Sequence, residues 1–392
     1  MVAQNDREIW IRCGTLHTPF QTQTDAVLHI VEGKIKQILV SSELAPISSS
    51  NVIHEPESIV VPGFIDLHVH GARGRDVMDG TLESLQTLSS SLASHGTTSF
   101  LATTLSAPDS DLEVALRGFT ANRQRVDGAR ALGVHLEGPY LNPARRGTHN
   151  TSHIRRADLQ AFRRLVQFSG NTIRKITLAP EMDDNLRVTR EATAMGIQIS
   201  IGHSDATAEQ ARAAVDNGAM VATHTFNAMR PLHQREPGIL GVVLTDDRLY
   251  AEVIADGVHV HPLALRLLLR AKGVDRTLLV TDGVSAVDMP DGQYPLGDKT
   301  VVVRGNECRD SDGALAGSTL TLDRAVRNLV NWLDIPVHQA VATATAVPAR
   351  SLRITASKGI LAPEADADLV FLDSELRVTK TMVGGRIVYS RN

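Results

Sequence analysis

The sequence predicts an α/β protein: a (β/α)8, TIM-like barrel with a small β-sandwich domain built from both chain termini. The central part of the chain alternates eight short β-branched runs with helix-like stretches, which is the order expected of a barrel. Both ends of the chain carry strand-like runs without helix-like stretches between them. The length of 392 residues fits this division, because an α/β barrel takes about 250 residues and leaves room for one small domain.

The two ends of the chain are assigned to the small domain. Near the N-terminus, Gly33 separates two strand-like runs in VEGKIKQILV, which predicts a hairpin. The segment SSELAPISSSN (41–51) predicts an exposed loop. The C-terminal segment ADLVFLDSELRVTKTMVGGRIVYS has the same strand-and-turn texture. We therefore expect residues 1–60 and 358–392 to form the small β domain and residues 61–357 to form the barrel.

The barrel prediction depends on counting eight strands. Helix-like stretches such as TLESLQTLSSSLASHG, DLEVALRGFTANRQRV and ATAEQARAAVDNGAM lie between them. A doubly wound open sheet is the competing arrangement, but it gives no reason for eight strands. The eight predicted strands are 61–70, 96–105, 131–141, 175–181, 198–203, 221–227, 251–260 and 278–284.

The composition is that of an ordinary globular protein. Hydrophobic residues make up 42% and charged residues 21%, which argues against disorder. A formal charge of -4 with 4% aromatic residues argues against nucleic-acid binding. No signal peptide is visible, and no apolar run reaches the roughly 18 residues of a membrane span. Two cysteines, Cys13 and Cys308, suit a reducing compartment. We expect a soluble cytoplasmic protein without a membrane partner.

Imidazole and carboxylate side chains stand at the ends of the predicted strands. His68 and His70 are two residues apart at the end of the first strand, so they share a face. Catalytic groups of barrels gather at this rim. Imidazole with carboxylate is the ligand set of a borderline divalent metal such as Zn²⁺, with Fe, Co and Mn as rivals. The other strand ends that carry such groups hold Glu137, His203, His224 and Asp282.

Three further expectations concern catalysis and substrate. Asp282 can take a proton from an attacking water and return it to the leaving group, although Asp-Gly also marks turns. His259 follows the seventh strand and can donate a hydrogen bond to a substrate carbonyl. His149 lies in the loop after the third strand and can reach the site, whereas His153 is not expected there.

Other histidines are expected to be structural. His135 shares a face with Glu137 but lies deeper in the strand, where it fills an inner barrel layer. His95 stands at the opposite end of the second strand, and His261 is expected to start a helix.

With these residues in view, the chain resembles the N-acetylglucosamine-6-phosphate deacetylases of the amidohydrolase superfamily over nearly its full length. The HxH pair alone is a mark of the superfamily, but HLEGP together with HTFNAM and REPG is more specific. The resemblance implies hydrolysis of the acetamide of N-acetyl-D-glucosamine 6-phosphate to D-glucosamine 6-phosphate and acetate, in amino-sugar catabolism or cell-wall recycling. The motifs are PGFIDLHVHG, HLEGPYLNPARRGTHN, GHSDA, HTFNAM, REPG, ADGVHV, TDG and LAGSTLT.

The resemblance also implies a ligand set. Glu137, His203 and His224 match the family's metal ligands. His68 and His70 match the pair that binds a second metal in some members. One or two divalent ions per subunit are therefore expected, with Glu137 as the bridge between two.

The resemblance implies substrate contacts as well. Asp282 matches the catalytic acid and base, and His259 matches the histidine on the substrate. Arg235 matches the arginine that reaches the phosphate of the neighbouring subunit's substrate, which implies a homodimer. The backbone positions implied to contact substrate are Gly138, Asn227 and Ala228.

Arg73 and Arg75 depart from the family pattern, in which neutral residues are expected. They either aid binding of an anionic sugar or point to solvent.

Other readings of the sequence remain open. A deacetylase of the galactosamine epimer would use the same motifs. A cyclic amidase of the same superfamily would need a carboxylated lysine at the rim, but Lys175 starts the fourth strand and Lys272 falls in a helical stretch. A catalytically inactive sugar-phosphate sensor would have lost Asp282 or a metal ligand, and none is lost.

Overall fold

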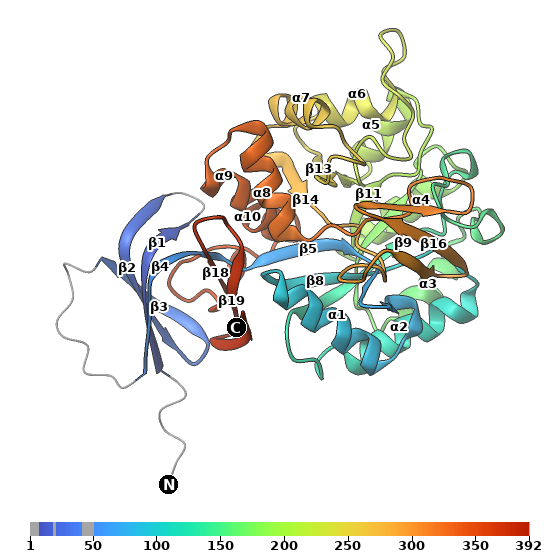
Figure 1. Ribbon diagram of the computed structural model, residues 1–392. Coiled ribbons are helices and arrows are strands. Elements are labelled where there is room, and N and C mark those ends of the chain that lie inside the picture. The colour runs from blue at the N-terminus through green and yellow to red at the C-terminus, as the bar shows by residue number, and fades with distance from the viewer. Residues whose placement is uncertain (1–7, 19–20, 41–50, 392) are drawn as a thin grey trace.

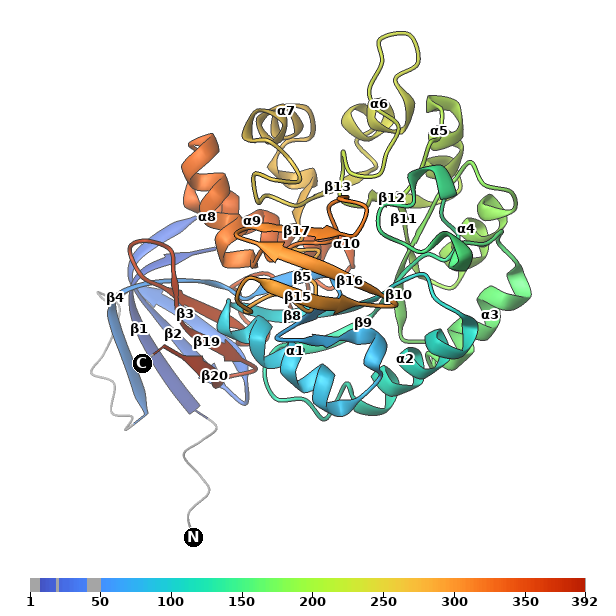
Figure 2. The same cartoon turned by 45° about the vertical axis from the view of Figure 1, so that its right-hand side comes forward.

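The computed structural model describes residues 8–18, 21–40 and 51–391. These residues form a nearly closed eight-stranded parallel barrel and a separate sheet-rich terminal domain (Figures 1 and 2). The predicted fold class is confirmed. The loop predicted at 41–51 lies, apart from its last residue, outside the described residues.

The barrel strands follow one another around the barrel in chain order, each parallel to the next. Parallel strands that are covered on both faces consist of nearly continuous apolar runs, so they can be recognised in the sequence. Every residue of the first two is buried. The strands are β5 (Phe64–Val69), β8 (Thr97–Thr104), β9 (Arg130–Glu137), β10 (Ile173–Leu178), β11 (Gln198–Ile201), β12 (Ala219–Ala222), β13 (Tyr250–Val253) and β14 (Thr277–Leu279).

The barrel closes between β5 and the segment that follows β14. The backbone N–H of Asp282 donates to the carbonyl of His68 at 2.9 Å, and that of His70 donates to Gly283 at 2.8 Å. The segment with Asp282 is therefore fixed directly to the strand that carries both histidines.

Helices surround the barrel. The side chain of Thr81 caps the first helix, and Thr207 with Gln210 forms a capping box on α5. Within the described residues, no helix is long and apolar enough to span a membrane. The α-helices are α1 (Leu82–Ser94), α2 (Asp109–Asn122), α3 (Leu159–Phe168), α4 (Asn185–Ala194), α5 (Ala208–Asp216), α6 (Gly238–Thr245), α7 (Pro262–Lys272), α8 (Leu322–Leu333), α9 (Val337–Ala344) and α10 (Ala346–Ser351).

A small antiparallel sheet interrupts the alternation after the eighth strand. The expectation that a helix follows this strand directly is wrong, because β15 (Gly292–Leu296), β16 (Lys299–Arg304) and β17 (Glu307–Asp310) come before α8. This sheet packs on a small apolar cluster of its own that includes Val301 and Cys308. Short elements elsewhere are β6 (Gly71–Ala72), β7 (Arg75–Asp76), η2 (Val77–Asp79), η3 (Pro143–Arg145), η4 (Thr151–His153) and η5 (Val274–Arg276).

The terminal domain joins the two ends of the chain in one seven-stranded sheet, in the order β20-β19-β18-β4-β1-β2-β3. Strand β4 pairs in parallel with β1 and antiparallel with β18, then leads into β5. The predicted hairpin is confirmed: Glu32 and Gly33, with φ of 51° and 76°, join β2 to β3. The strands are β1 (Glu8–His17), β2 (Thr22–Val31), β3 (Lys34–Val40), β4 (Val52–Pro62), β18 (Leu369–Leu372), β19 (Val378–Val383) and β20 (Arg386–Ser390).

Candidate metal centre

The carboxyl ends of the barrel strands surround a cavity of about 250 Å³. His68 lies fully buried beneath it. Gly138 and Arg235 do not line it. The predicted site residues that do line it are His70, Glu137, His149, His203, His224, Asn227, Ala228, His259 and Asp282.

Left-handed backbone turns aim several of these side chains into the cavity. The sequence placed His203, His224 and Asp282 within strand ends, but each lies just beyond its strand, with φ of 47°, 29° and 51°. A non-glycine residue in this region costs about 1–3 kcal/mol, so the surrounding structure has to hold it there. Because strand geometry cannot continue through a positive φ, the strands end earlier than the apolar runs suggest.

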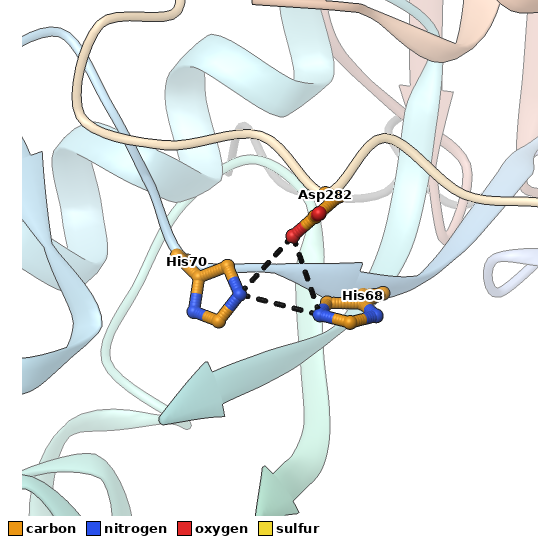
Figure 3. Close-up of side chains that lie close together, drawn as sticks. All are labelled: His68, His70 and Asp282. Atoms are coloured by element: carbon orange, nitrogen blue, oxygen red, sulfur yellow. Dashed lines mark hydrogen bonds and ion pairs between the residues drawn. The ribbon is translucent and has the colours of Figure 1, made fainter. Parts of the chain in front are cut away.

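One group of candidate ligands comes from β5 and the closing segment. Figure 3 shows His68, His70 and Asp282 facing one another. The Nε2 atoms of the two histidines lie 3.2 Å apart. Asp282 Oδ1 is 3.4 Å from Nε2 of His68 and 3.2 Å from Nε2 of His70.

A second group comes from β9 and the residues after β11 and β12. Glu137 Oε1 lies 3.3 Å from Nε2 of both His203 and His224, and these two nitrogens are 3.0 Å apart. Its other oxygen, Oε2, lies 3.3 Å from Nε2 of both His68 and His70. Glu137 thus presents one carboxylate oxygen to each pair of imidazoles.

The cluster attracts positive charge. Burial disfavours the imidazolium form, but Glu137 and Asp282 outweigh it and raise the pKa of His68 to about 10 and that of His70 to about 9. Conversely, burial raises the pKa of a carboxyl group, yet the facing histidines hold the pKa of Glu137 and of Asp282 below the usual range. Protons and a metal cation compete for the same nitrogens in such a site.

Hydrogen bonds distinguish a candidate ligand from a donor among the histidines. His203 Nδ1 lies 2.9 Å from the carbonyl of Arg145, which can only accept, so Nε2 keeps its lone pair for the cavity. His149 Nδ1 instead accepts from the backbone N–H of Ser106 at 3.2 Å. Its Nε2–H therefore faces Glu137 Oε2, 3.5 Å away, as a donor. Burial lowers the pKa of His149 to about 4, so the ring is neutral at pH 7.

Both groups fit a divalent metal ion. Within each, the candidate ligand atoms lie within 4.8 Å of one another, and all the residues are buried. Imidazole nitrogens 3.0 to 3.2 Å apart that point at one another and at a carboxylate are the donor set such a cation requires.

His259 is held by an aspartate that the sequence reasoning did not single out. Asp256 Oδ2 lies 2.6 Å from His259 Nδ1, and its Oδ1 accepts from the backbone N–H of Val258 and of His259 at 2.8 Å. The signal that could have identified it is the carboxylate three residues before the histidine in ADGVH, a spacing typical of an Asx turn.

The histidines that were not expected in the site lie outside the candidate metal centre. His135 lies inside the barrel, with Nε2 2.7 Å from Thr177 Oγ1. His261 caps α7, where its side chain accepts from the N–H of Leu263. His153 lines a neighbouring cavity of about 410 Å³ rather than the candidate site.

His95 gives a pH-dependent contribution to stability. Its nitrogens lie 2.7 Å from Asp288 and 3.5 Å from Asp323. Burial lowers its pKa, but these carboxylates outweigh burial and raise it to about 9 from 6.5. The stabilisation is therefore complete below pH 6.5 and lost as the pH rises through 9.

Melting curves should show His95→Gln losing about 2 °C or more in Tm relative to wild type at pH 6. The loss should be smaller at pH 9.5. An equal loss at both values would contradict the charged pair.

The remaining predicted residues lie outside the cavity. Gly138 follows Glu137 with a φ of 80°, and a Cβ there would lie 2.2 Å from Ser106 Oγ. Arg235 is exposed in the loop that leads into α6. This loop extends away from the barrel (Figures 1 and 2). The two arginines that depart from the family pattern form ion pairs outside the cavity. Arg73 pairs with Asp288, and Arg75 pairs with Glu83.

The chain is similar to known proteins over most of its length. The amidohydrolase family matches residues 59–388. N-acetylglucosamine-6-phosphate deacetylase of Vibrio furnissii is 42% identical over 331 residues, which cover 84% of this chain and 83% of that protein. N-acetylgalactosamine-6-phosphate deacetylase of Escherichia coli O157:H7 is 39% identical over 364 residues, covering 93% and 94%.

A solved structure is similar over almost the whole chain. It is a mutant N-acetyl-D-glucosamine-6-phosphate deacetylase of Mycobacterium smegmatis in complex with N-acetyl-D-glucosamine 6-phosphate. The TM-score is 0.92 at 32% sequence identity, with 98% of this chain and 100% of that chain covered. With its barrel, its buried His and carboxylate groups and a match across most of its length, this chain belongs to the amidohydrolase family.

Proposed function

We propose that this protein is an N-acetylglucosamine-6-phosphate deacetylase, which hydrolyses the acetamide of N-acetyl-D-glucosamine 6-phosphate to D-glucosamine 6-phosphate and acetate. The observation that carries the proposal is the bridging position of Glu137 between two pairs of imidazoles, beside Asp282. The relatives with this activity in their names, which match more than four-fifths of the chain, support the substrate.

Glu137, His203 and His224 would hold one divalent ion, and His68 with His70 would hold a second. Zn²⁺ is our first choice, with Fe, Co and Mn as alternatives, because imidazole with carboxylate suits borderline metals. Such an ion supplies Lewis-acid activation of water and of the carbonyl under attack.

Asp282 serves as the general base and then as the general acid. Its carboxylate takes one proton from the attacking water as the water oxygen bonds to the acetamide carbon. The same carboxyl group then gives that proton to the nitrogen as the carbon–nitrogen bond breaks, releasing the amine and acetic acid, which loses its proton to give acetate.

His259 orients and polarises the acetamide. Asp256 Oδ2 lies against Nδ1 of His259 and fixes the ring, so that Nε2 is the nitrogen available to donate a hydrogen bond to the carbonyl oxygen as negative charge develops there. The backbone at Asn227 and Ala228, which lines the cavity, contacts the sugar. Gly138, which does not line the cavity, fixes the backbone next to Glu137 with its φ of 80°.

The test is acetate release from N-acetylglucosamine 6-phosphate and from N-acetylglucosamine by the metal-loaded protein. We expect a kcat/KM at least about a hundredfold higher on the phosphorylated sugar, as a charge-assisted phosphate contact provides. Release from neither compound would overturn the proposed substrate.

A deacetylase of N-acetylgalactosamine 6-phosphate is the second candidate. The Escherichia coli O157:H7 relative of that name, at 39% identity over 93% of this chain, favours it. The same assay with the galactosamine epimer distinguishes the two, since the preferred epimer will have the higher kcat/KM. A cyclic amidase is disfavoured, because Lys175 is paired with Glu252 inside the barrel and Lys272 ends α7.

Arg235 binds the substrate phosphate of the neighbouring subunit in a homodimer. Arg235→Ala should therefore raise KM for the phosphorylated sugar by about 10- to 100-fold, the value of a hydrogen bond to a charged group. Turnover of the unphosphorylated sugar should change little. Arg156→Ala, which removes another exposed arginine, is the control. Equal losses on both sugars would remove the phosphate role.

The dimer arrangement has a separate test by complementation. Co-expressed Arg235→Ala and Asp282→Asn chains should form mixed dimers with one site that has both groups. Activity restored well above that of either variant would support an arginine shared between subunits. No restoration would place Arg235 outside the neighbouring site.

We also assign the protein to the cytoplasm. Cys13 and Cys308 are buried free thiols, as suits a reducing compartment.

A further inference from the structure

A charged pair lies inside the barrel beneath the metal centre. Lys175 on β10 and Glu252 on β13 are fully buried and in contact through Nζ and Oε1. Strands β11 and β12 separate β10 from β13, so the pair spans the barrel interior. Barrel interiors are usually filled by branched apolar side chains. A buried ion pair contributes little net stability compared with an apolar replacement, so packing alone does not account for this one.

The free oxygen of Glu252 faces a metal-site histidine. Glu252 Oε2 lies 3.6 Å from Nδ1 of His68, just beyond hydrogen-bond length. Both atoms are buried, and neither has a hydrogen-bond partner elsewhere among the described residues. On the opposite side of the ring, His68 Nε2 faces Glu137 and Asp282 at 3.3 and 3.4 Å.

We infer that Glu252 is a positioning residue for His68, with Lys175 holding its carboxylate in place. A carboxylate opposite Nδ1 favours the tautomer in which Nδ1 carries the hydrogen and Nε2 offers its lone pair to the metal. The result is a stronger ion site at the group made by His68, His70 and Asp282. This inference rests on the metal-dependent function proposed above.

The arrangement differs at the other metal-site histidines. His203 has the backbone carbonyl of Arg145 opposite its cavity-facing nitrogen. His224 Nδ1 and His70 Nδ1 are buried without a hydrogen-bond partner in the described part of the chain. Glu252 therefore acts on the His68 group and not on the group of Glu137, His203 and His224.

Two matched double variants isolate the contact. Lys175→Met/Glu252→Gln and Lys175→Met/Glu252→Leu both remove the buried charges, so neither leaves an uncompensated ion. They differ in that glutamine keeps an oxygen that can accept from His68 Nδ1–H, whereas leucine does not. A purely structural role predicts the same metal binding in both variants once melting curves show that they are folded.

The measurement is Zn²⁺ binding by the metal-stripped full chain, titrated against a competing chelator. We expect one of the bound ions to be held about 10- to 100-fold more weakly by the leucine variant than by the glutamine variant. The other ion should be unaffected. Identical titrations, whether for one ion or for two, would overturn the inference.

If the leucine variant does not fold, the tautomer of His68 can be measured in the wild-type protein instead. A long-range ¹H–¹⁵N spectrum of the Zn²⁺-loaded protein should show His68 protonated at Nδ1, and an unprotonated Nδ1 would overturn the inference. Because these readouts measure metal binding and tautomer, absence of sugar-phosphate hydrolysis would refute the proposed function without changing them.

Discussion

Asp282→Asn should lower kcat by about 10²- to 10⁴-fold, the usual contribution of a general acid and base. The amide cannot accept a proton from water or return one to the amine. It does keep an oxygen at the position of Oδ1, which lies 3.2 Å from His70 Nε2. Bound metal, measured per chain by atomic emission, should therefore stay at the wild-type value.

A matched control separates chemistry from folding in this test. Asp298→Asn alters another aspartate near the mouth of the barrel, where it pairs with Asn150 and His153 outside the cluster. This variant should keep near-normal turnover. If Asp282→Asn also turned over normally, the acid and base role would belong to another group.

Glu137→Gln should abolish tight metal binding and with it nearly all activity. The carboxylate faces imidazole nitrogens on both sides, at 3.3 Å in each of four contacts. Glutamine would present an NH₂ group to one pair, and that group cannot coordinate a cation. We expect metal content after dialysis to fall from the wild-type value to near zero, and kcat/KM to fall by about a thousandfold or more, since catalysis needs the ion.

The control for this prediction is a glutamate outside the centre. Glu83→Gln removes only an exposed partner of Arg75 and should leave metal content and kcat/KM unchanged. Full metal occupancy in Glu137→Gln would contradict the bridging arrangement and assign the ions to histidine and Asp282 alone.

The sequence was sufficient to predict most of the cluster, for a topological reason. All parallel barrel strands end at the same rim, so residues such as Glu137 and His224 can be grouped by knowing only that each follows a strand. This grouping requires no contact between residues far apart in the sequence to be known. The positive φ at His203, His224 and Asp282 was not predicted, because the left-handed turn depends on how neighbouring strands close.

The charges behind the cluster could not be predicted in this way. Lys175 and Glu252 belong to strands that are not neighbours, and their contact depends on the curvature of the closed barrel. From the sequence alone, a lysine at the start of a strand is expected to be exposed to solvent. Only the closed barrel shows that Lys175 is buried. Likewise, the sheet of β15 to β17 is a local insertion that the βα alternation does not contain.

The position of β4 in the terminal sheet has a consequence for synthesis of the chain. This strand runs directly into β5, yet one of its edges pairs with β18, which lies more than three hundred residues later. While the ribosome makes the barrel, that edge has no partner and can pair with a strand of another chain. Completion of the C-terminal strands is therefore the step that covers this edge, and shortening the chain there would leave the same edge exposed.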